Sequence, residues 1–421
     1  MGNAQSPSSK NPRSVTASRA FSKQELDDLQ SLFVSLASQS KSSSKFISPS
    51  VFQSYFKIHG PLSSRLIDLI TQNRRDGMLT YDDLLITKAT YEKGTRDEIE
   101  EFVYQLCDVT GDGVLSRFDL EAVLASIHDA VFSPGNVGSS SSLDRDVLQV
   151  FLNAATFAKQ GEGADSMSFA DFKNWCAVLP SVRKALGSLL TPPDPSIPGF
   201  QLPQLQYPED ISSDMLILRK EDAWHIGGAL SQSEAEEWKL LYHSAINGLS
   251  FNTFMGNISS GDGPTVLVIK DTEGHIYGGY ASQQWERQSA FFGDMRSFLF
   301  QLYPRASIFR PTGANNNLQW CAVNFSSDSI PNGIGFGGRE NHFGLFISAN
   351  FDRGHTFSCT TFNSPCLSKS SQIVPEVIEC WGTVVKGLQN EKAELPKGTV
   401  LERFKEDRNM LKMVGLANAS E

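Results

Sequence analysis

Apolar residues recur at helical spacing in the first part of the chain. In the stretch "SKQELDDLQSLFVSLA", Ser22 and Glu25 have the spacing of a capping box, in which each side chain bonds the backbone amide of the other residue. Leucine and phenylalanine then follow at intervals of three or four residues, the period of an amphipathic helix. Thr95 and Glu98 repeat this signal before a second helix that runs to Leu106. The pattern predicts a helical N-terminal domain.

A proline-dense stretch, "LTPPDPSIPGFQLPQLQYPED", has neither a helical nor a strand period. It predicts a semi-extended linker or a strap along a neighbouring surface, after which the pattern changes. The segments 265–270 and 276–281 read as two strands joined by a turn at Gly274, and "LQWCAVNF", "HFGLFISANF" and "HTFSCTTF" continue with β-branched and aromatic residues. Ser231 and Glu234 predict the start of a helix that carries Trp238 and Tyr242. Strands without regular βαβ alternation favour a β-sandwich flanked by helices.

The stretch "IPNGIGFGGREN" is rich in glycine, which suits either a phosphate-binding loop or tightly packed strands. A phosphate loop leads into the N-terminus of a helix, whose free amides hold the anion. Here the glycines lead into the strand "HFGLFISANF". Glycine in strands marks turns and close backbone approach, so the stretch is interpreted as scaffold.

The second helix leads directly into "DVTGDGVLSRFD", which follows the EF-hand template. The predicted ligands alternate along this loop: Asp108, Thr110, Asp112, Val114 through its carbonyl, Ser116 through a water, and Asp119. Gly113 permits the sharp turn at position six. Asp119 stands where a bidentate Glu is usual, and its shorter side chain predicts one weak Ca²⁺ site, with Mg²⁺ as the alternative ion. A loop of EF-hand shape that binds no metal is the competing interpretation.

Three further stretches resemble eroded loops of the same kind. In "QNRRDGMLTYDD", Arg74 stands at a ligand position, and "QGEGADSMSFAD" keeps Met167 but lacks the leading acid and the glycine. "FISPSVF" resembles the exit of another unit. Leu115 occupies the apolar position through which such loops pair. We therefore expect four helix–loop–helix units in two pairs, with only the third able to hold metal.

Composition narrows the function classes. The chain has 421 residues and a formal net charge of -10, and it shows no basic stripe with interleaved aromatics, which argues against a nucleic-acid partner. No apolar run approaches the ~20 residues that span a bilayer. The six cysteines form no CxxC pair and suit a reducing compartment. Cys359 and Cys366 are close enough to invite a redox interpretation, against which stands simple burial on strands.

The N-terminal stretch "MGNAQS" fits the pattern for N-myristoylation at Gly2, and nearby lysines and arginines form a mild basic patch. It lacks the apolar segment of a secretory signal. Because one acyl chain holds a protein on a membrane only marginally, reversible attachment is expected.

At the other end, residues 399–421 carry a second amphipathic pattern. The apolar positions proposed to bind a partner are Leu401, Phe404, Leu411 and Val414. Two interpretations stay open: a helix packed on its own domain, and a helix that docks on another protein.

Five blocks occur in an order that resembles the TLDc domain family: "LYHSAINGLSFNTF", "GHIYGGYAS", "FFGDMRSFLFQLYP", "GFGGRENHFGLFISANFDRGHTFSCTTFNSPCLS" and "IECWG". With a glycine-led N-terminus and an EF-hand-like part before these blocks, the domain organisation of the chain resembles that of myristoylated members of this family. The expected organisation is a disordered, lipidated N-terminus (1–20), an all-α EF-hand-like domain (21–189), a proline-rich linker (190–211), an α+β TLDc domain with a two-sheet antiparallel β-sandwich (212–386) and a C-terminal helical extension (387–421).

The resemblance implies a non-enzymatic regulator that binds subunits of the vacuolar-type proton pump (V-ATPase) at the cytoplasmic face of lysosomal or vacuolar membranes. It also implies a cytosolic pool, a monomeric chain and a link to mTOR-type signalling. The alternatives are a TLDc protein of oxidative-stress resistance and a Ca²⁺-sensing signalling adaptor. No catalytic motif is present. Glu340 and Glu379 could face a shared pocket and perform acid–base work, but a solvated carboxylate, or one that anchors backbone amides in the sandwich, is the favoured interpretation.

Overall fold

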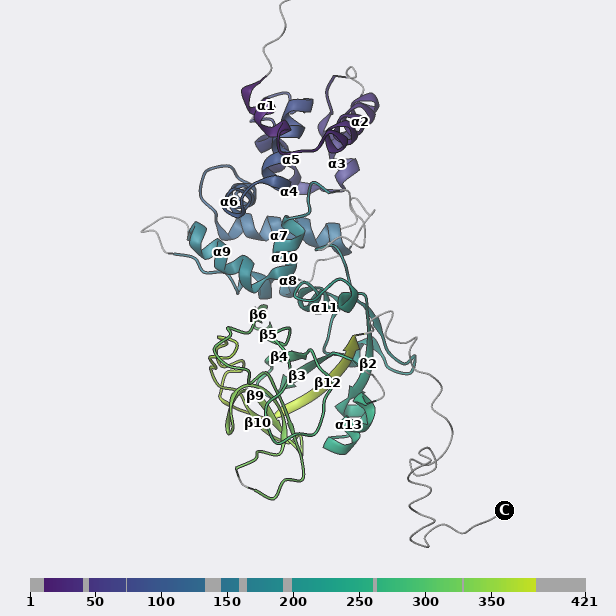
Figure 1. Cartoon of the computed structure of the whole chain (residues 1–421), viewed down its shortest axis with the longest axis vertical. Helices are drawn as coiled ribbons and strands as arrows, with labels where there is room; N and C mark the ends of the chain where they lie inside the picture. Colours follow the sequence, from purple (N-terminus) through teal and green to yellow (C-terminus); the bar gives the residue numbers. More distant parts are fainter. Residues whose placement is uncertain are drawn as a thin grey trace, which may run out of the picture. The chain divides into compact units, whose positions relative to one another are not determined.

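The computed structural model describes residues 11–40, 45–72, 74–132, 145–158, 165–191, 199–259, 263–327 and 329–383. Helices make up the first part of the chain and strands dominate the second (Figure 1). This order confirms the predicted fold class in its broad terms. The predicted C-terminal helix lies outside the described residues. The segment predicted to be disordered (1–20) contains helix α1 (Pro12–Ser18), and the predicted linker (190–211) contains strand β1 (Gln204–Gln206).

Several helices of the first part begin at polar caps. Both predicted capping boxes are present, Ser22 with Glu25 and Thr95 with Glu98, and each satisfies backbone amides that a helix N-terminus leaves free. The helices are α1 (Pro12–Ser18), α2 (Lys23–Gln39), α3 (Pro49–Phe56), α4 (Gly60–Ile70), α5 (Tyr81–Lys93), α6 (Arg96–Cys107), α7 (Arg117–Phe132), α8 (Arg145–Leu152), α9 (Phe169–Val178) and α10 (Pro180–Leu186).

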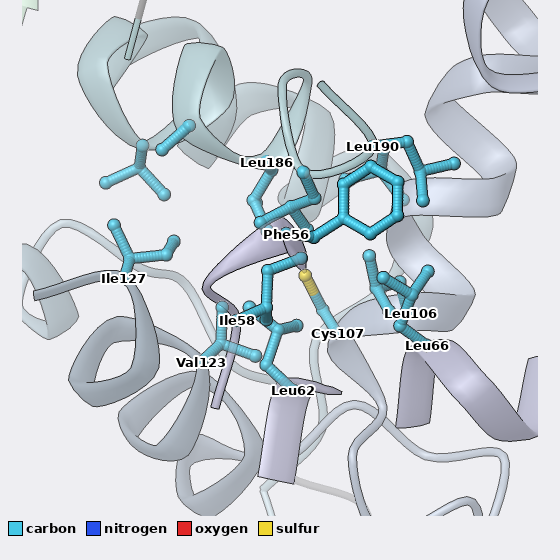
Figure 2. Close-up of a cluster of buried hydrophobic side chains, with 14 of the residues drawn as sticks. Phe56, Ile58, Leu62, Leu66, Leu106, Cys107, Val123, Ile127, Leu186 and Leu190 are labelled. Carbon is cyan, nitrogen blue, oxygen red and sulfur yellow. The ribbon is translucent and has the colours of Figure 1, made fainter. Parts of the chain in front are cut away.

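One apolar core joins these helices. Leu62 and Leu66 of α4 meet Leu106 of α6 and Val123 of α7 in a cluster that Figure 2 shows, and each of these side chains is fully buried. Complete burial of one aliphatic side chain contributes about 1.5–3 kcal/mol to the stability of the fold. The helices on either side of the "DVTGDGVLSRFD" loop are therefore fixed by packing, independently of what the loop binds.

The second part contains two sheets. The larger has the strand order β1-β2-β12-β3-β4-β5-β6, the smaller has the order β11-β10-β9-β8-β7, and every pairing is antiparallel except β1 with β2. The strands are β1 (Gln204–Gln206), β2 (Glu237–His243), β3 (Thr265–Asp271), β4 (Ile276–Ala281), β5 (Phe298–Tyr303), β6 (Ser307–Phe309), β7 (Gln319–Ala322), β8 (Gly333–Arg339), β9 (His342–Ser348), β10 (Gly354–His355), β11 (Gln372–Ile373) and β12 (Pro375–Thr383).

Strand β3 lies between two cores. Leu267 and Ile269 point into a core shared with Phe336 of the smaller sheet, so the two sheets pack face to face. Val266 and Val268 point to the opposite face, into a second core that includes residues of α11 (Lys220–Gly227). Burial on both faces explains the unbroken apolar run of this strand. The remaining short helices are η1 (Ser213–Met215), η2 (Ser233–Ala235), α12 (Ser244–Asn247) and α13 (Phe251–Ile258).

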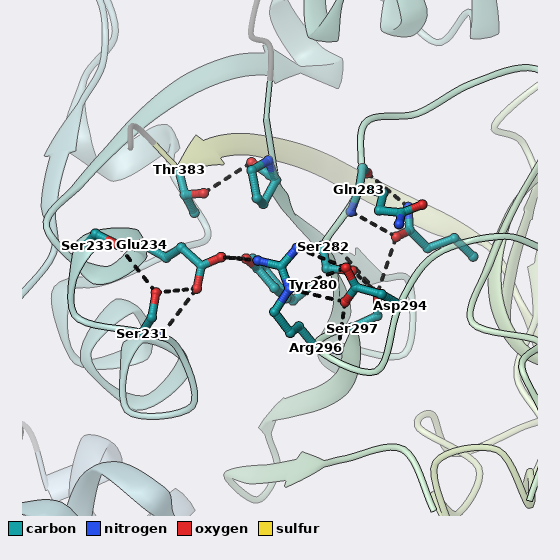
Figure 3. Close-up of polar contacts among 12 residues, drawn as sticks. Ser231, Ser233, Glu234, Tyr280, Ser282, Gln283, Asp294, Arg296, Ser297 and Thr383 are labelled. Carbon is teal, nitrogen blue, oxygen red and sulfur yellow. Dashed lines mark hydrogen bonds and ion pairs between the residues drawn. The ribbon is translucent and has the colours of Figure 1, made fainter. Parts of the chain in front are cut away.

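The prediction of a helix after Ser231 is wrong, because residues 237–243 form strand β2. The capping contact exists, since Ser231 Oγ donates to Glu234 Oε2 at 2.5 Å, but it closes only the single turn of η2. The other carboxylate oxygen accepts hydrogen bonds from the Tyr280 hydroxyl at 2.8 Å and from Arg296 Nη1 at 3.1 Å (Figure 3). Glu234 thus ties η2 to the sheet, and pairing with β12 decides the extended conformation of β2.

The glycine-rich stretch forms β8 and pairs with β9 throughout, which confirms its interpretation as scaffold. Gly338 has φ +82°, and a Cβ there would lie 2.2 Å from the carbonyl oxygen of His342. A side chain at this position would separate the two strands.

Residues of the second part also pack into the helical core. Trp224 of α11 belongs to that core, and its indole Nε1 donates to the carbonyl of Gly199 at 2.9 Å. A Cβ at Gly228 would lie 2.4 Å from the amide nitrogen of Ser181 in α10, so these backbones touch. The amide of Ala306 donates to the carbonyl of Val150 at 2.8 Å.

Candidate functional site

The loop between α6 and α7 turns through two glycines in the left-handed region. Asp108 ends α6 in a non-helical conformation, and Gly111 and Gly113 then have φ +73° and +84°. Such values suit glycine because it has no Cβ. Ser116 and Asp119 begin α7, where the amide of Asp119 donates to Ser116 Oγ at 3.3 Å and the amide of Ser116 donates to Asp119 Oδ2 at 2.9 Å.

The carboxylates at the two ends of the loop accept hydrogen bonds from the loop itself. Asp108 Oδ1 accepts from the amide of Gly111 at 2.8 Å, and its Oδ2 accepts from the amide of Gly113 at 3.0 Å. Asp119 Oδ1 accepts from the amide of Thr110 at 3.0 Å. Both aspartates are buried. The loop is therefore closed by its own carboxylates, and Asp119 at its end bonds Thr110 near its start.

The middle of the loop is exposed. Asp112 Oδ1 accepts from the amide of Val114 at 2.8 Å, and the Thr110 hydroxyl donates to Asp108 Oδ1 at 3.2 Å. The six predicted ligand residues supply oxygen donors of the kind that Ca²⁺ takes. Within the described ranges, however, the structure contains no cluster of three or more His, Cys, Asp or Glu side chains arranged to hold a metal. Metal binding would therefore require these carboxylates to exchange amide donors for the ion.

The loops pair as predicted. The amide of Met167 donates to the carbonyl of Leu115 at 2.8 Å, beside an antiparallel bridge between Ser116 and Ser166. In the first pair, the amide and carbonyl of Ile47 bond those of Leu79 at 2.9 and 3.0 Å. This confirms the expected pairing of the helix–loop–helix units, while their metal content remains a prediction.

An arginine outside the predicted ligand set contacts the candidate loop. Arg65 of α4 places Nη2 3.3 Å from Asp108 Oδ2. The two residues are 43 positions apart. No pattern within the loop could have indicated this contact, because it depends on how α4 packs against α6.

In the sheet part, Glu379 anchors backbone amides, which is one of the alternatives weighed against acid–base work. Its carboxylate is fully buried and accepts hydrogen bonds from the amides of Ile217 at 2.6 Å and Leu218 at 3.2 Å, and from the indole of Trp381 at 2.9 Å. Burial raises the pKa of Glu379 above its usual value, and these donors and His243 oppose the rise. The contacts tie the segment before α11 to strand β12.

Three exposed apolar side chains lie on segments that His243 joins. His243 Nε2 lies 3.1 Å from the carbonyl of Met215 and 3.6 Å from Glu379 Oε1. Ile246 and Leu249 follow His243 directly along the chain, in and just after α12. The exposed fractions of Met215, Ile246 and Leu249 are 46%, 47% and 50%. We refer to these three residues as the α12 surface. Exposed apolar side chains that gather into one patch are typical of binding surfaces.

The remaining predicted residues divide into two groups. Cys359 is buried beside Ser364, and the half-buried Cys366 points its thiol at the carbonyls of Thr356 and Ser368, each at 3.3 Å. All cysteines in the described ranges are free thiols. Outside the described residues lie the lipidation position, Gly2, and the partner-binding positions Leu401, Phe404, Leu411 and Val414. In the part of the chain that the structure covers, every helix is too short or too polar to cross a bilayer.

Comparison with known proteins agrees with the sheet part of this structure. Residues 211–384 match the TLDc domain, so the chain contains a TLDc domain. It is similar to MTOR-associated protein MEAK7 of Mus musculus, with 36% identity over 200 residues, which is 47% of this chain and 43% of that protein. The Homo sapiens protein of the same name is 35% identical over 202 residues, again 47% of this chain and 43% of that protein. Nuclear receptor coactivator 7 of Homo sapiens is 33% identical over 144 residues, 34% of this chain and 14% of that protein. The chain thus aligns with less than half the length of these relatives.

Proposed function

Because the chain contains a TLDc domain, we propose that it is a non-catalytic regulator that binds V-ATPase subunits at lysosomal or vacuolar membranes. The observation that carries the proposal is the match of residues 211–384 to the TLDc domain, which belongs to regulatory proteins. Relatives named as mTOR-associated proteins support a link of this chain to mTOR-type signalling. Acylation at Gly2 and docking of the C-terminal amphipathic segment are parts of the same proposal.

The α12 surface is the candidate contact within the described residues. Its side chains stand on a segment fixed from beneath by His243 and the buried Glu379, so little conformational freedom would be lost on binding. Burial of half-exposed aliphatic side chains in an interface supplies the apolar contact that hot spots need.

The test is affinity purification of the full chain from detergent-solubilised vacuolar or lysosomal membranes. Wild type is expected to recover V-ATPase subunits, and the double variant Ile246→Ser with Leu249→Ser is expected to recover at least about tenfold less, as for loss of a binding hot spot. The matched control is Val374→Ser, which removes an equally exposed apolar side chain elsewhere on the sheet part. Failure of the wild-type chain to recover any pump subunit would remove the proposal, and equal recovery by the double variant would remove the α12 surface from it.

We also propose that the loop from Asp108 to Asp119 is a weak Ca²⁺ site that tunes this binding. In its support, the loop has oxygen donors at the alternating positions that Ca²⁺ requires, and it is paired with a second loop through Leu115. The carboxylates must give up amide hydrogen bonds to bind the ion, which is consistent with low affinity. Calorimetric titration of the full chain with Ca²⁺ tests this, and the binding heat should vanish in Asp108→Ala.

A further inference from the structure

The guanidinium of Arg65 bridges the last turn of α6 and the candidate metal loop. Its Nε donates to the carbonyl of Gln105 at 3.2 Å, and its Nη2 lies 3.3 Å from Asp108 Oδ2. Its Nη1 lies 2.9 Å from the position that a Cβ at Gly111 would occupy. The side chain is only 14% exposed, so it is held in this position between two segments.

Two of these contacts stabilise groups that would otherwise be poorly satisfied. The carbonyl of Gln105 belongs to the last turn of α6, where carbonyls have no partner within the helix, and the negative end of the helix dipole favours a cation there. Asp108 is a buried carboxylate, and a buried charge is costly unless it is paired. Arg65 therefore supplies the positive charge that this end of the loop requires.

Asp108 is also the first predicted ligand of the metal loop. A divalent cation bound at this carboxylate would stand close to the guanidinium, and two like charges at that distance repel strongly in a partly buried site. The carboxylate oxygen that faces Arg65 also accepts the amide of Gly113. The Asp108 carboxylate can therefore pair with only one cation at a time, either Arg65 or the metal ion.

We infer that Arg65 is an internal cation that stabilises the loop without metal and competes with Ca²⁺ for Asp108. This inference rests on the proposed Ca²⁺ site and names what sets its affinity. The arginine raises the Ca²⁺ concentration at which the loop is occupied. Its release from Asp108 accompanies metal binding, so metal occupancy is coupled to the contact between α4 and α6.

The chain offers a matched control. Arg74 follows α4 and pairs with Asp83, the last residue of the neighbouring loop in the first pair, so Arg74→Gln removes the same charge from an analogous contact. Arg65→Lys keeps a positive charge near Asp108, and Arg65→Gln removes it.

The experiment is calorimetric titration of each full-length chain with Ca²⁺ at fixed ionic strength, together with thermal unfolding in chelator. Arg65→Gln is expected to lower the dissociation constant for Ca²⁺ by about tenfold or more, because a repulsive charge is removed. In chelator its unfolding temperature should fall below that of wild type, and Ca²⁺ should restore it. Arg65→Lys and Arg74→Gln should bind Ca²⁺ within about threefold of wild type, since neither removes the charge beside Asp108.

Equal Ca²⁺ affinity of wild type and Arg65→Gln would overturn the inference and leave the proposed metal site standing. Absence of binding heat in both chains would overturn the two together. A further measurement uses the wild-type chain, so it tests the inference even if Arg65→Gln does not fold. The Arg65 Nε–H resonance, assigned by its loss in Arg65→Lys, should move during Ca²⁺ titration, and an unmoved signal in a chain that binds Ca²⁺ would also overturn the inference.

Discussion

Single buried carboxylates decide how the segments of this protein are held. Glu379 and Asp108 are both buried, and each accepts several hydrogen bonds. Those to Glu379 include the distant amides of Ile217 and Leu218, and those to Asp108 include amides of its own loop. Each has a charged or titratable partner from a distant segment, His243 for the first and Arg65 for the second. Removal of one partner from such a buried pair strongly destabilises the fold, because the other charge is left buried and unpaired.

Replacement of Glu379 by Gln tests this at the residue scale. The amide nitrogen of Gln cannot accept a hydrogen bond, so at least one of the donors from Ile217, Leu218 and Trp381 loses its partner. We expect the free energy of unfolding to fall by about 2–4 kcal/mol. Urea unfolding followed by tryptophan fluorescence measures the change.

The control is Glu376→Gln on the same strand. Glu376 is half-exposed and pairs with Lys270 at 2.9 Å. An exposed pair contributes little, so stability should change by less than about 0.5 kcal/mol. A loss for Glu379→Gln as small as for this control would contradict the anchor interpretation.

At the scale of elements, helices α10 and α11 approach as closely as their backbones allow. Gly228 follows α11 with helical φ, so alanine would be acceptable to the backbone, but its Cβ would lie 2.4 Å from the amide nitrogen of Ser181. Gly228→Ala should therefore push the two helices apart and cost about 2 kcal/mol or more. Thermal unfolding measures the loss.

Gly256 provides the comparison, since it lies within α13 and a Cβ there would meet nothing within 4 Å. Gly256→Ala should leave the fold intact and stabilise it by up to about 1 kcal/mol, because alanine favours helix. If both substitutions had the same effect, close packing of α10 on α11 would not be the cause.

Local patterns in the sequence predicted the elements that local contacts determine. The capping boxes at Ser22 and Thr95, the loop glycines and the strands β3 and β4 depend on neighbours within a few residues, and the structure contains them. Strand β2 was missed because its conformation depends on β12, whose Trp381 pairs with Leu240 from far along the chain. For the same reason Arg65 could not be found from the loop.

For the whole molecule, the contact between the helical and sheet parts contains a histidine that stays neutral. His225 of α11 is completely buried, with its ring edge-on to Phe151 of α8 at a centroid distance of 5.5 Å. Burial lowers the pKa of His225 to about 3.

This gives a pH dependence of stability. The unfolded chain takes up a proton on this histidine below its ordinary pKa of 6.5, and the folded chain does not until about 3, so stability is lost as pH falls through that window. Between pH 7.5 and 5, wild type should lose about 2 kcal/mol more than His225→Phe. Urea unfolding at the two pH values measures the difference. An identical pH dependence in wild type and His225→Phe would contradict this origin.

Trp224 has a consequence for how such a protein can evolve. Its indole belongs to the TLDc part of the chain by sequence and to the helical core by packing. Recombination that joined this TLDc domain to another partner domain would leave a large apolar ring without its surroundings, and new helices would lack the backbone that fits Gly228. The two parts are therefore expected to be inherited together, and substitutions at Trp224 or Gly228 to be accompanied by changes in α8 and α10.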